Sequence, residues 1–220
     1  MPKFLLAAAA AALVFAGQAL VAPAFADAQV APVVAAPAAA PAAPSVRAGD
    51  YRLDKSHAKI LWSVSHFGFS TYTGEFTDFD ASLTLDPANP ARSRLTATIA
   101  TPSVATHNDA LDTHLRSADF FDAAAHPTAT FVSTEVHPTG PRTADVTGNF
   151  TMRGVTRPLT LAVTFNAAGN NMAGTYTAGF SATGTIRRSE YGMTYAVPAV
   201  GDDIELRISG EFNQAAAAAR

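Results

Sequence analysis

The sequence predicts an all-β protein: an eight-stranded antiparallel barrel with one short helix near residues 108–117. Three observations predict it. Eight runs of residues alternate between polar and apolar side chains, which is the period of a half-buried strand. The breaks between the runs are rich in Pro, Gly and Asn, which favour turns. Eight strands also suffice to close a barrel, and closure leaves no exposed sheet edge. A two-sheet sandwich produces the same pattern and stays the alternative.

The alternating runs follow one another through most of the chain. In each run one parity is apolar, and the other is mostly polar or small. The runs are 58–66, 79–85, 95–99, 131–136, 146–152, 159–165, 178–186 and 204–212. The turn-rich breaks are 86–90, 138–141, 153–154 and 166–171.

One segment, residues 108–117, departs from this alternation. Leu111 and Leu115 lie one helical turn apart, so they share a face of a helix. Either Thr106 or Asn108 could cap the start of that helix. We therefore expect a short helix across one end of the barrel, with both leucines facing inward.

The first 26 residues have the features of a signal peptide. Lys3 precedes an apolar run, 4–16, that is too short to span a bilayer, and Ala24-Phe25-Ala26 is a cleavage pattern. An uncleaved membrane anchor is the alternative. Cleavage after residue 26 predicts export to the periplasm, with secretion as a second destination, and no stable membrane insertion afterwards.

Composition sets the remaining domain boundaries. Residues 27–48 are almost entirely Ala, Pro and Val, which predicts an extended linker. Residues 49–213 form the predicted barrel domain, and residues 214–220 form a predicted disordered tail.

The chain has no cysteine, which excludes disulfides, cysteine-ligated zinc and iron–sulfur clusters. Its formal net charge is −3 and its basic residues are dispersed, so we expect no nucleic-acid binding. No nucleophile-elbow, phosphate-loop or dinucleotide glycine pattern occurs. We therefore predict no catalytic residues, no metal and no reactive cofactor.

A set of ordered motifs extends through the predicted barrel domain, in segments 51–57, 62–68, 74–80, 103–106, 112–121, 127–133, 148–161, 179–180 and 188–192. Taken together, these motifs resemble the YceI-like family, whose members are exported, lipocalin-like barrels that bind polyisoprenoid lipids. Two positions depart from the family pattern: Leu111 stands where many members have arginine, and His126 stands where tyrosine is common. The resemblance implies that the barrel interior holds a lipid.

The aromatic residues independently allow such an interior, because they supply a large apolar surface. Each of them, taken singly, also fits an ordinary packed core. The residues predicted to form the apolar wall are Trp62, Phe67, Phe69, Phe76, Phe79, Phe120, Phe121, Phe131, Phe150, Phe165 and Phe180. Of these, Phe120 and Phe121 are expected to plug or line the mouth.

A set of polar residues near the predicted helix is expected to contact the ligand head or to hold a lid. The set is His66, Asp112, His114, Arg116, Ser117 and Asp119. His66 ends an apolar stripe, so it fits either a buried histidine or a contact to a lipid head. A link from Arg116 to Asp119 or to Asp112 is expected to orient the lid.

The predicted function is a periplasmic lipid-binding protein that holds one polyisoprenoid, or a similar long-chain amphiphile, for carriage or storage. A quinone-like ligand fits the same description. Two alternatives stay open: a small hydrolase or isomerase acting on a lipid-like substrate in the cavity, and an interaction module whose barrel is filled. A homodimer is one of the assemblies that the sequence leaves open.

Overall fold

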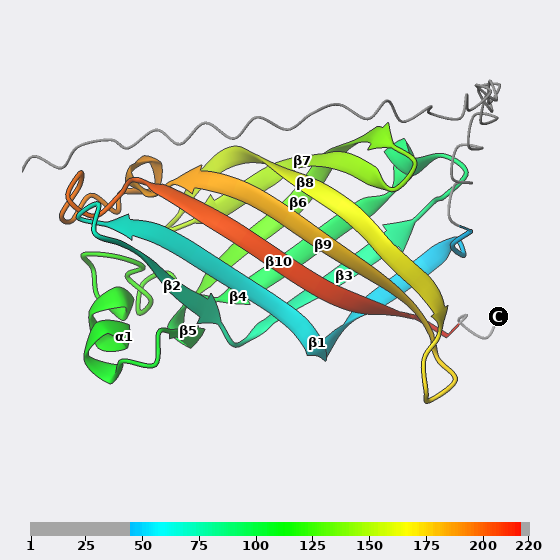
Figure 1. Ribbon diagram of the computed structural model, residues 1–220, viewed down its shortest axis with the longest axis horizontal. Coiled ribbons are helices and arrows are strands. Elements are labelled where there is room, and N and C mark those ends of the chain that lie inside the picture. The colour runs from blue at the N-terminus through cyan, green and yellow to red at the C-terminus, as the bar shows by residue number, and fades with distance from the viewer. Residues whose placement is uncertain (1–44, 217–220) are drawn as a thin grey trace, which may run out of the picture. The chain divides into compact units, whose positions relative to one another are not determined.

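The computed structural model describes residues 45–216, which form a β-barrel with a short helix at one end (Figure 1). The strands are β1 (Gly49–His66), β2 (Ser70–Phe76), β3 (Phe79–Leu85), β4 (Arg94–Ala100), β5 (Val104–Ala105), β6 (Thr128–Gly140), β7 (Thr143–Met152), β8 (Val155–Asn170), β9 (Tyr176–Arg187) and β10 (Asp203–Gln214). The α-helix is α1 (Asp109–Arg116), and three 3-10 turns are η1 (Pro90–Arg92), η2 (Thr101–Ser103) and η3 (Arg188–Tyr191).

The sheet closes on itself, and all its pairings are antiparallel. Around the barrel the strands follow the order β10-β9-β8-β7-β6-β4-β3-β1, and β1 then pairs with β10. The first half of β1 pairs with β3 and its second half with β2, so β2 continues the position of β3. The short β5 pairs with β2 beyond the end of β4. The predicted eight-stranded barrel is therefore confirmed, and the sandwich alternative is wrong.

β1 is longer than the alternation predicted because a bulge interrupts its pattern. Between Asp54 and Lys59 its register against β10 shifts, and β10 advances by only two residues over the same interval. Both halves of β1 therefore pair within the barrel, but the extra residues of the bulge interrupt the alternation of polar and apolar side chains in the sequence.

β2 was missed as a strand because one of its inward positions is a glycine. Gly74 pairs with Trp62 across the β1–β2 ladder, and a Cβ at Gly74 would overlap the Trp62 indole. The indole thus fills the space that an apolar side chain of β2 would otherwise occupy. A glycine at this point is required by the close approach of the ring.

The predicted helix is confirmed. Asn108 is its N-cap, and the Asn108 side chain accepts a hydrogen bond of 3.2 Å from the Leu111 backbone N–H. Leu115 is buried and Leu111 packs against the same cluster, so both leucines face inward as expected. Thr106 does not cap the helix.

The described residues extend the barrel domain slightly at both ends. The linker was expected to reach residue 48, but Val46 packs against the barrel, and the Arg47 guanidinium lies 4.0 Å from the centre of the Tyr176 ring. Gln214 was expected in the tail, but it is the last residue of β10 and its side chain donates to the Ala48 carbonyl. The predicted signal peptide, most of the linker and residues 217–220 lie outside the described residues.

No helix within residues 45–216 is both long enough and apolar enough to cross a membrane.

Candidate functional site

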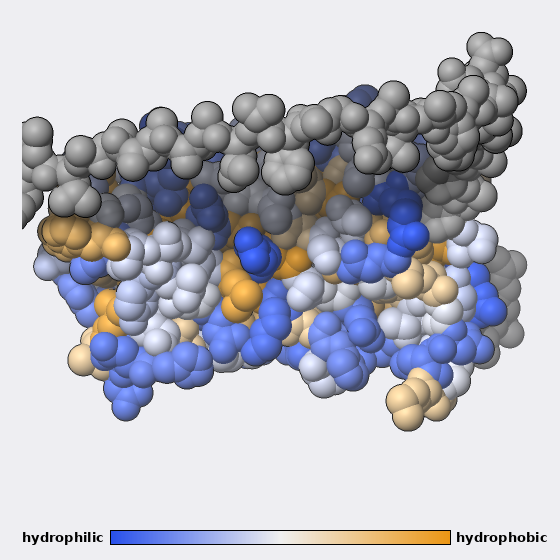
Figure 2. Space-filling view, in the orientation of Figure 1, coloured by the Kyte–Doolittle hydropathy of each residue, from blue (hydrophilic) through white to orange (hydrophobic). Residues whose placement is uncertain are grey.

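The barrel encloses a cavity of about 1060 Å³. Its wall is made by inward-facing side chains from the strands, by α1 and by the loop that follows β9, and it is overwhelmingly apolar. The outer surface is different: Figure 2 shows a face that is largely hydrophilic, with smaller apolar areas between the polar side chains. An interior of this size is not filled by the protein's own rings, and it matches the volume of pockets that bind small molecules.

Ten of the eleven predicted wall residues line the cavity. They are Trp62, Phe67, Phe76, Phe79, Phe120, Phe121, Phe131, Phe150, Phe165 and Phe180. The prediction for Phe69 is wrong, because its side chain is 90% exposed and does not line the cavity. Phe69 belongs to the turn between β1 and β2, where the backbone has positive φ at Phe67 and Gly68, so strand parity does not continue through it.

α1 and residues 188–202, called here the closing loop, lie at one end of the barrel (Figure 1), and side chains from both line the cavity. Three aromatic side chains meet there. The His114 ring lies 5.0 Å from the rings of both Phe120 and Tyr195, and the last two are 5.5 Å apart. All three line the cavity, and so does His66. Edge-to-face packing of this kind joins the helix to the closing loop without a polar link.

The cavity also reaches the opposite end of the barrel, which was not expected. Its rim there is formed by the turn before β4 and by the β6–β7 hairpin. The rim residues that line the cavity include Pro87, Pro90, Arg94, Pro138, Pro141 and Arg142. The rim is therefore rich in prolines, whose fixed φ limits the conformations of these turns.

The principal residue missed from the sequence is Arg188, at the start of η3. Its side chain is only 3% exposed, and it lines the cavity at the end beside α1. Burial lowers the pKa of the Arg188 guanidinium below its ordinary value. The sequence signal that could have identified Arg188 was weak. The closing loop has no periodic hydrophobic pattern, and Arg188 is one of two adjacent arginines at the end of a strand.

Comparison with known proteins places this architecture in a family. The model of the YceI-like domain matches residues 51–212. This chain belongs to the YceI-like family. Two UPF0312 proteins are similar to it: the one from Ectopseudomonas mendocina is 41% identical over 166 residues, covering 74% of this chain and 87% of the relative. The one from Pseudomonas putida strain GB-1 is 42% identical, covering 74% and 86%.

Three solved structures share the fold. Burkholderia cenocepacia BcnA superposes with a TM-score of 0.66 at 26% identity, covering 72% of this chain and 98% of BcnA. The Campylobacter jejuni YceI protein has a TM-score of 0.63 at 31% identity, covering 69% and 90%. A polyisoprenoid-binding domain from Saccharophagus degradans has a TM-score of 0.56 at 14% identity, covering 77% and 100%; at this identity the likeness shows the fold alone.

In this YceI-like domain, four of the six residues predicted to contact a ligand head or hold a lid do not line the cavity. His66 and His114 line it, whereas Asp112, Arg116, Ser117 and Asp119 do not. Asp119 instead contacts His114 from outside, with its carboxylate 3.1 Å from His114 Nε2. Ser117 follows the helix, and its backbone N–H donates to the His114 carbonyl.

The expected link from Arg116 to Asp119 or Asp112 is wrong. Arg116 donates to two backbone carbonyls instead, from Nε to Pro102 at 2.8 Å and from Nη2 to Val104 at 3.1 Å. Both carbonyls lie near the short β5, where the barrel ladder is interrupted. Buried or half-buried carbonyls need donors, and the guanidinium supplies them while it fixes α1 against β5.

Asp112 has a structural role at the start of α1. It is 7% exposed, and its Oδ1 accepts hydrogen bonds from the Thr106 backbone N–H at 2.8 Å and from the Thr106 hydroxyl at 2.6 Å. These bonds tie the chain that enters the helix to the first turn of the helix itself.

Replacing Asp112 by alanine is therefore expected to lower the free energy of unfolding by about 1–3 kcal/mol, because two buried donors of Thr106 lose their acceptor. Urea denaturation of the purified chain measures this. Asp112→Asn is the matched control, because it keeps an oxygen acceptor and should lose less. An Asp112→Ala variant as stable as the parent would show that the Thr106 contacts do not matter.

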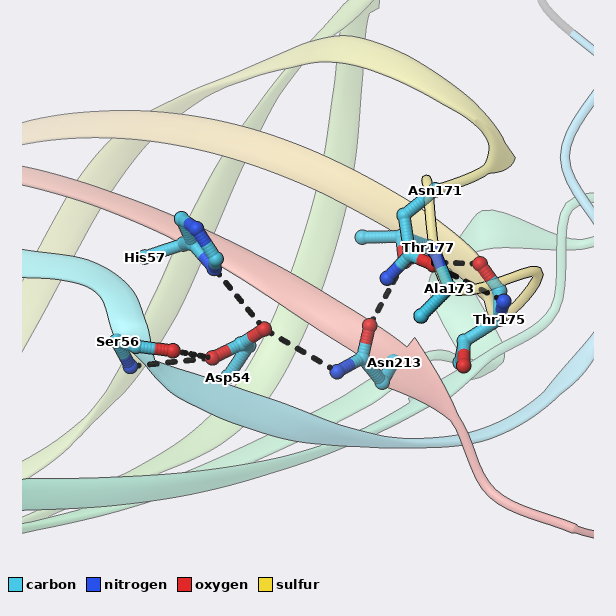
Figure 3. A network of polar contacts seen from close by, with 8 residues as sticks. All are labelled: Asp54, Ser56, His57, Asn171, Ala173, Thr175, Thr177 and Asn213. Atoms are coloured by element: carbon cyan, nitrogen blue, oxygen red, sulfur yellow. Dashed lines mark hydrogen bonds and ion pairs between the residues drawn. The ribbon is translucent and has the colours of Figure 1, made fainter.

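A separate polar network lies on the outer wall, at the bulge in β1 (Figure 3). Asp54 accepts from the backbone and hydroxyl of Ser56, contacts His57 Nδ1 at 3.0 Å and accepts from Asn213 on β10. The hydrogen bond from the Ser56 hydroxyl is the main reason that the pKa of Asp54 falls to about 2. The bond to Asp54 raises the pKa of His57.

Glu211 lies opposite Asp54 in the ladder, and the ligand atoms of Asp54, His57 and Glu211 fall within 4.8 Å of one another. Such a set could hold a cation. Hydrogen bonding already accounts for the positions of Asp54 and His57, and the bond from Asn213 to Asp54 ties the bulge to β10. The absence of a metal site therefore stays a prediction.

Proposed function

We propose that this YceI-like domain binds one polyisoprenoid, or a similar long-chain amphiphile, inside the barrel for carriage or storage. The observation that carries the proposal is the apolar cavity of about 1060 Å³ within a closed barrel. The structural neighbour from Saccharophagus degradans is described as a polyisoprenoid-binding domain, and the proposal extends that ligand class to this chain.

The energetics of such binding are favourable without any charge pair. Burial of each methylene contributes about 0.8 kcal/mol. Association costs about 4–15 kcal/mol in lost freedom of motion. A ligand of several isoprene units offers enough methylene and methyl groups to exceed that cost, provided that its tail lies along the apolar wall. This requirement favours a long chain over a compact ligand.

The proposal includes export. The features of residues 1–26 are those of a cleavable signal peptide, and they support a periplasmic location. In an aqueous compartment a long isoprenoid needs a container, and a barrel with an apolar interior and a hydrophilic exterior supplies one. We propose binding rather than catalysis, because holding an apolar ligand requires only an apolar wall and no reacting group.

The proposal is tested by expressing the full chain in a bacterial host and analysing what is released. Native mass spectrometry, followed by solvent extraction of the same sample, should show one long apolar molecule for each chain. Protein that has been stripped of lipid and refolded should take up a polyprenol from detergent micelles. A chain that carries no apolar molecule and takes up no polyprenol would contradict the proposal.

A further inference from the structure

We propose that the end of the barrel beside α1 carries a docking surface for an uncharged lipid bilayer. The surface consists of the β1–β2 turn and the outer part of the closing loop, residues 66–69 and 194–199, called here the apolar tip. The inference rests on the proposed lipid-binding function, because a bilayer is the place from which a water-insoluble ligand is collected.

The apolar tip exposes aromatic side chains that the core does not need. Phe69 is 90% exposed and does not line the cavity. Phe67 and Tyr195 are 53% and 50% exposed, although both also line the cavity. Exposed alanine and proline side chains complete the part contributed by the closing loop. Large apolar side chains are unfavourable in water, so a group of them marks an interaction surface.

Backbone contacts join the two segments of the apolar tip into one surface. The Phe67 backbone N–H donates to the Ala199 carbonyl at 2.7 Å, and His66 forms an antiparallel bridge with Val200. Figure 1 shows the β1–β2 turn and the closing loop together at the end of the barrel where α1 lies. The exposed rings therefore belong to a single patch and are not scattered over the surface.

The backbone of the apolar tip is held in an unfavourable conformation. Phe67 has φ 54° and Ala196 has φ 56°, in a region that residues with a Cβ adopt rarely. Gly68 stands between the two phenylalanines with φ 70°, and a Cβ there would meet nothing within 4 Å, so the turn projects into open space. Such conformations persist mainly at functional sites.

The charges at this end of the barrel favour a neutral bilayer as the partner. No residue of the apolar tip is Asp, Glu, Lys or Arg. The exposed charged residues on α1, on the segment that follows it and on η3 are all acidic: Asp109, Asp119 and Glu190. Aromatic rings are favoured at the boundary between the headgroups and the hydrocarbon of a bilayer. The acidic surroundings predict no attraction to anionic lipids.

The apolar tip is continuous with the wall of the cavity. Phe67, Tyr195 and Ala196 are exposed, and the same three residues line the cavity. A bilayer that contacts the tip therefore touches side chains that also reach the interior of the barrel. This continuity favours a bilayer over a second copy of the chain, because a second copy would have no use for a path to the cavity.

The test uses the absence of cysteine from the chain. The full chain is expressed in a bacterial host with its own leader, and an NBD fluorophore is attached to one introduced cysteine, Ser70→Cys beside the tip or Ala173→Cys in the β8–β9 hairpin. Since β9 begins at that hairpin and ends at the closing loop, the two labels lie at opposite ends of the barrel. Phosphatidylcholine vesicles should brighten and blue-shift the label at position 70 and leave the label at position 173 unchanged.

Variants made in the Ser70→Cys background then locate the contact. Phe69→Ser should weaken partitioning into the vesicles about tenfold, because the ring no longer enters the bilayer. Phe69→Trp should preserve it, because tryptophan is also favoured at the interface. Met172→Ser is the matched control: it removes a fully exposed apolar side chain at the opposite end and should change nothing. Since Phe69 does not line the cavity, lipid retention should be the same in all variants.

Three results would overturn the docking surface. The first is a label at position 70 that stays in water when vesicles are added. The second is binding that requires phosphatidylglycerol in the vesicles and disappears at high salt, which would make the contact electrostatic. The third is self-association in sedimentation without vesicles that Phe69→Ser abolishes, which would assign the tip to a second copy. Lipid retention, measured by mass spectrometry on the same samples, decides the proposed function separately.

Discussion

Replacing Ala97 and Ala182 together by tryptophan is expected to abolish ligand uptake while the barrel still folds. Both alanines line the cavity. In the strand order β4 and β9 are four positions apart among eight, so the two indoles would enter from opposite walls. The cavity gives the two indoles room to adopt ordinary rotamers, so overpacking should lower the stability of the fold only slightly.

The rings would occupy space that the ligand tail needs. Excluding even two methylenes from the wall removes about 1.6 kcal/mol of binding, which is more than about tenfold in affinity. Extraction followed by mass spectrometry measures the retained lipid. Ala162→Trp on the exposed outer face of β8 is the matched control and should keep full occupancy. Full occupancy in the double variant would mean that the ligand does not use the barrel interior.

Replacing Gly148 by alanine is expected to lower the free energy of unfolding by about 1–3 kcal/mol. A Cβ at this point on β7 would lie 2.6 Å from the Val132 carbonyl oxygen and 2.5 Å from Cζ of the Phe131 ring. The carbonyl belongs to the neighbouring strand β6, so it cannot retreat without disturbing the ladder. The ring is part of the cavity wall.

The midpoint of urea denaturation measures the loss. Gly169→Ala is the matched control, because Gly169 also lies in a strand and a Cβ there would meet nothing within 4 Å. That control should be neutral or slightly more stable, since alanine reduces the freedom of the unfolded chain. Equal midpoints for the two variants would show that β6 and β7 have room to separate.

The parts of the fold that were predictable are those in which side-chain alternation reports burial directly. Runs such as 159–165 and 204–212 have one face in the cavity and one in solvent, so period two survives in the sequence. The helix was predictable because Leu111 and Leu115 repeat at a helical interval. β2 was not predicted as a strand, because the Trp62 ring occupies the space of one of its inward side chains and that position is a glycine.

The candidate site was less predictable than the fold. Alternation along the strands identifies the side chains of the cavity wall, but not the helix and loop at the end of the barrel. Ten of the eleven predicted wall residues line the cavity, most of them on strands where parity applies, whereas Phe69 lies in a turn and points away from it. Charge patterns suggested ion pairs for Arg116, whereas the structure gives it backbone carbonyls. Arg188 is the extreme case, because its partners come from a loop without any repeat. Such contacts depend on tertiary geometry alone.

The seam between β1 and β10 joins the beginning of the domain to its end, with Tyr51 opposite Gln214. A nascent chain therefore cannot close the barrel until β10 has been synthesised, and the sheet has two unpaired edge strands until then. Pairings this distant in sequence make folding slow compared with a helical protein of similar size. We expect the ligand to bind only after β1 has paired with β10. Deletion of β10 should therefore leave an open, aggregation-prone sheet rather than a smaller closed barrel.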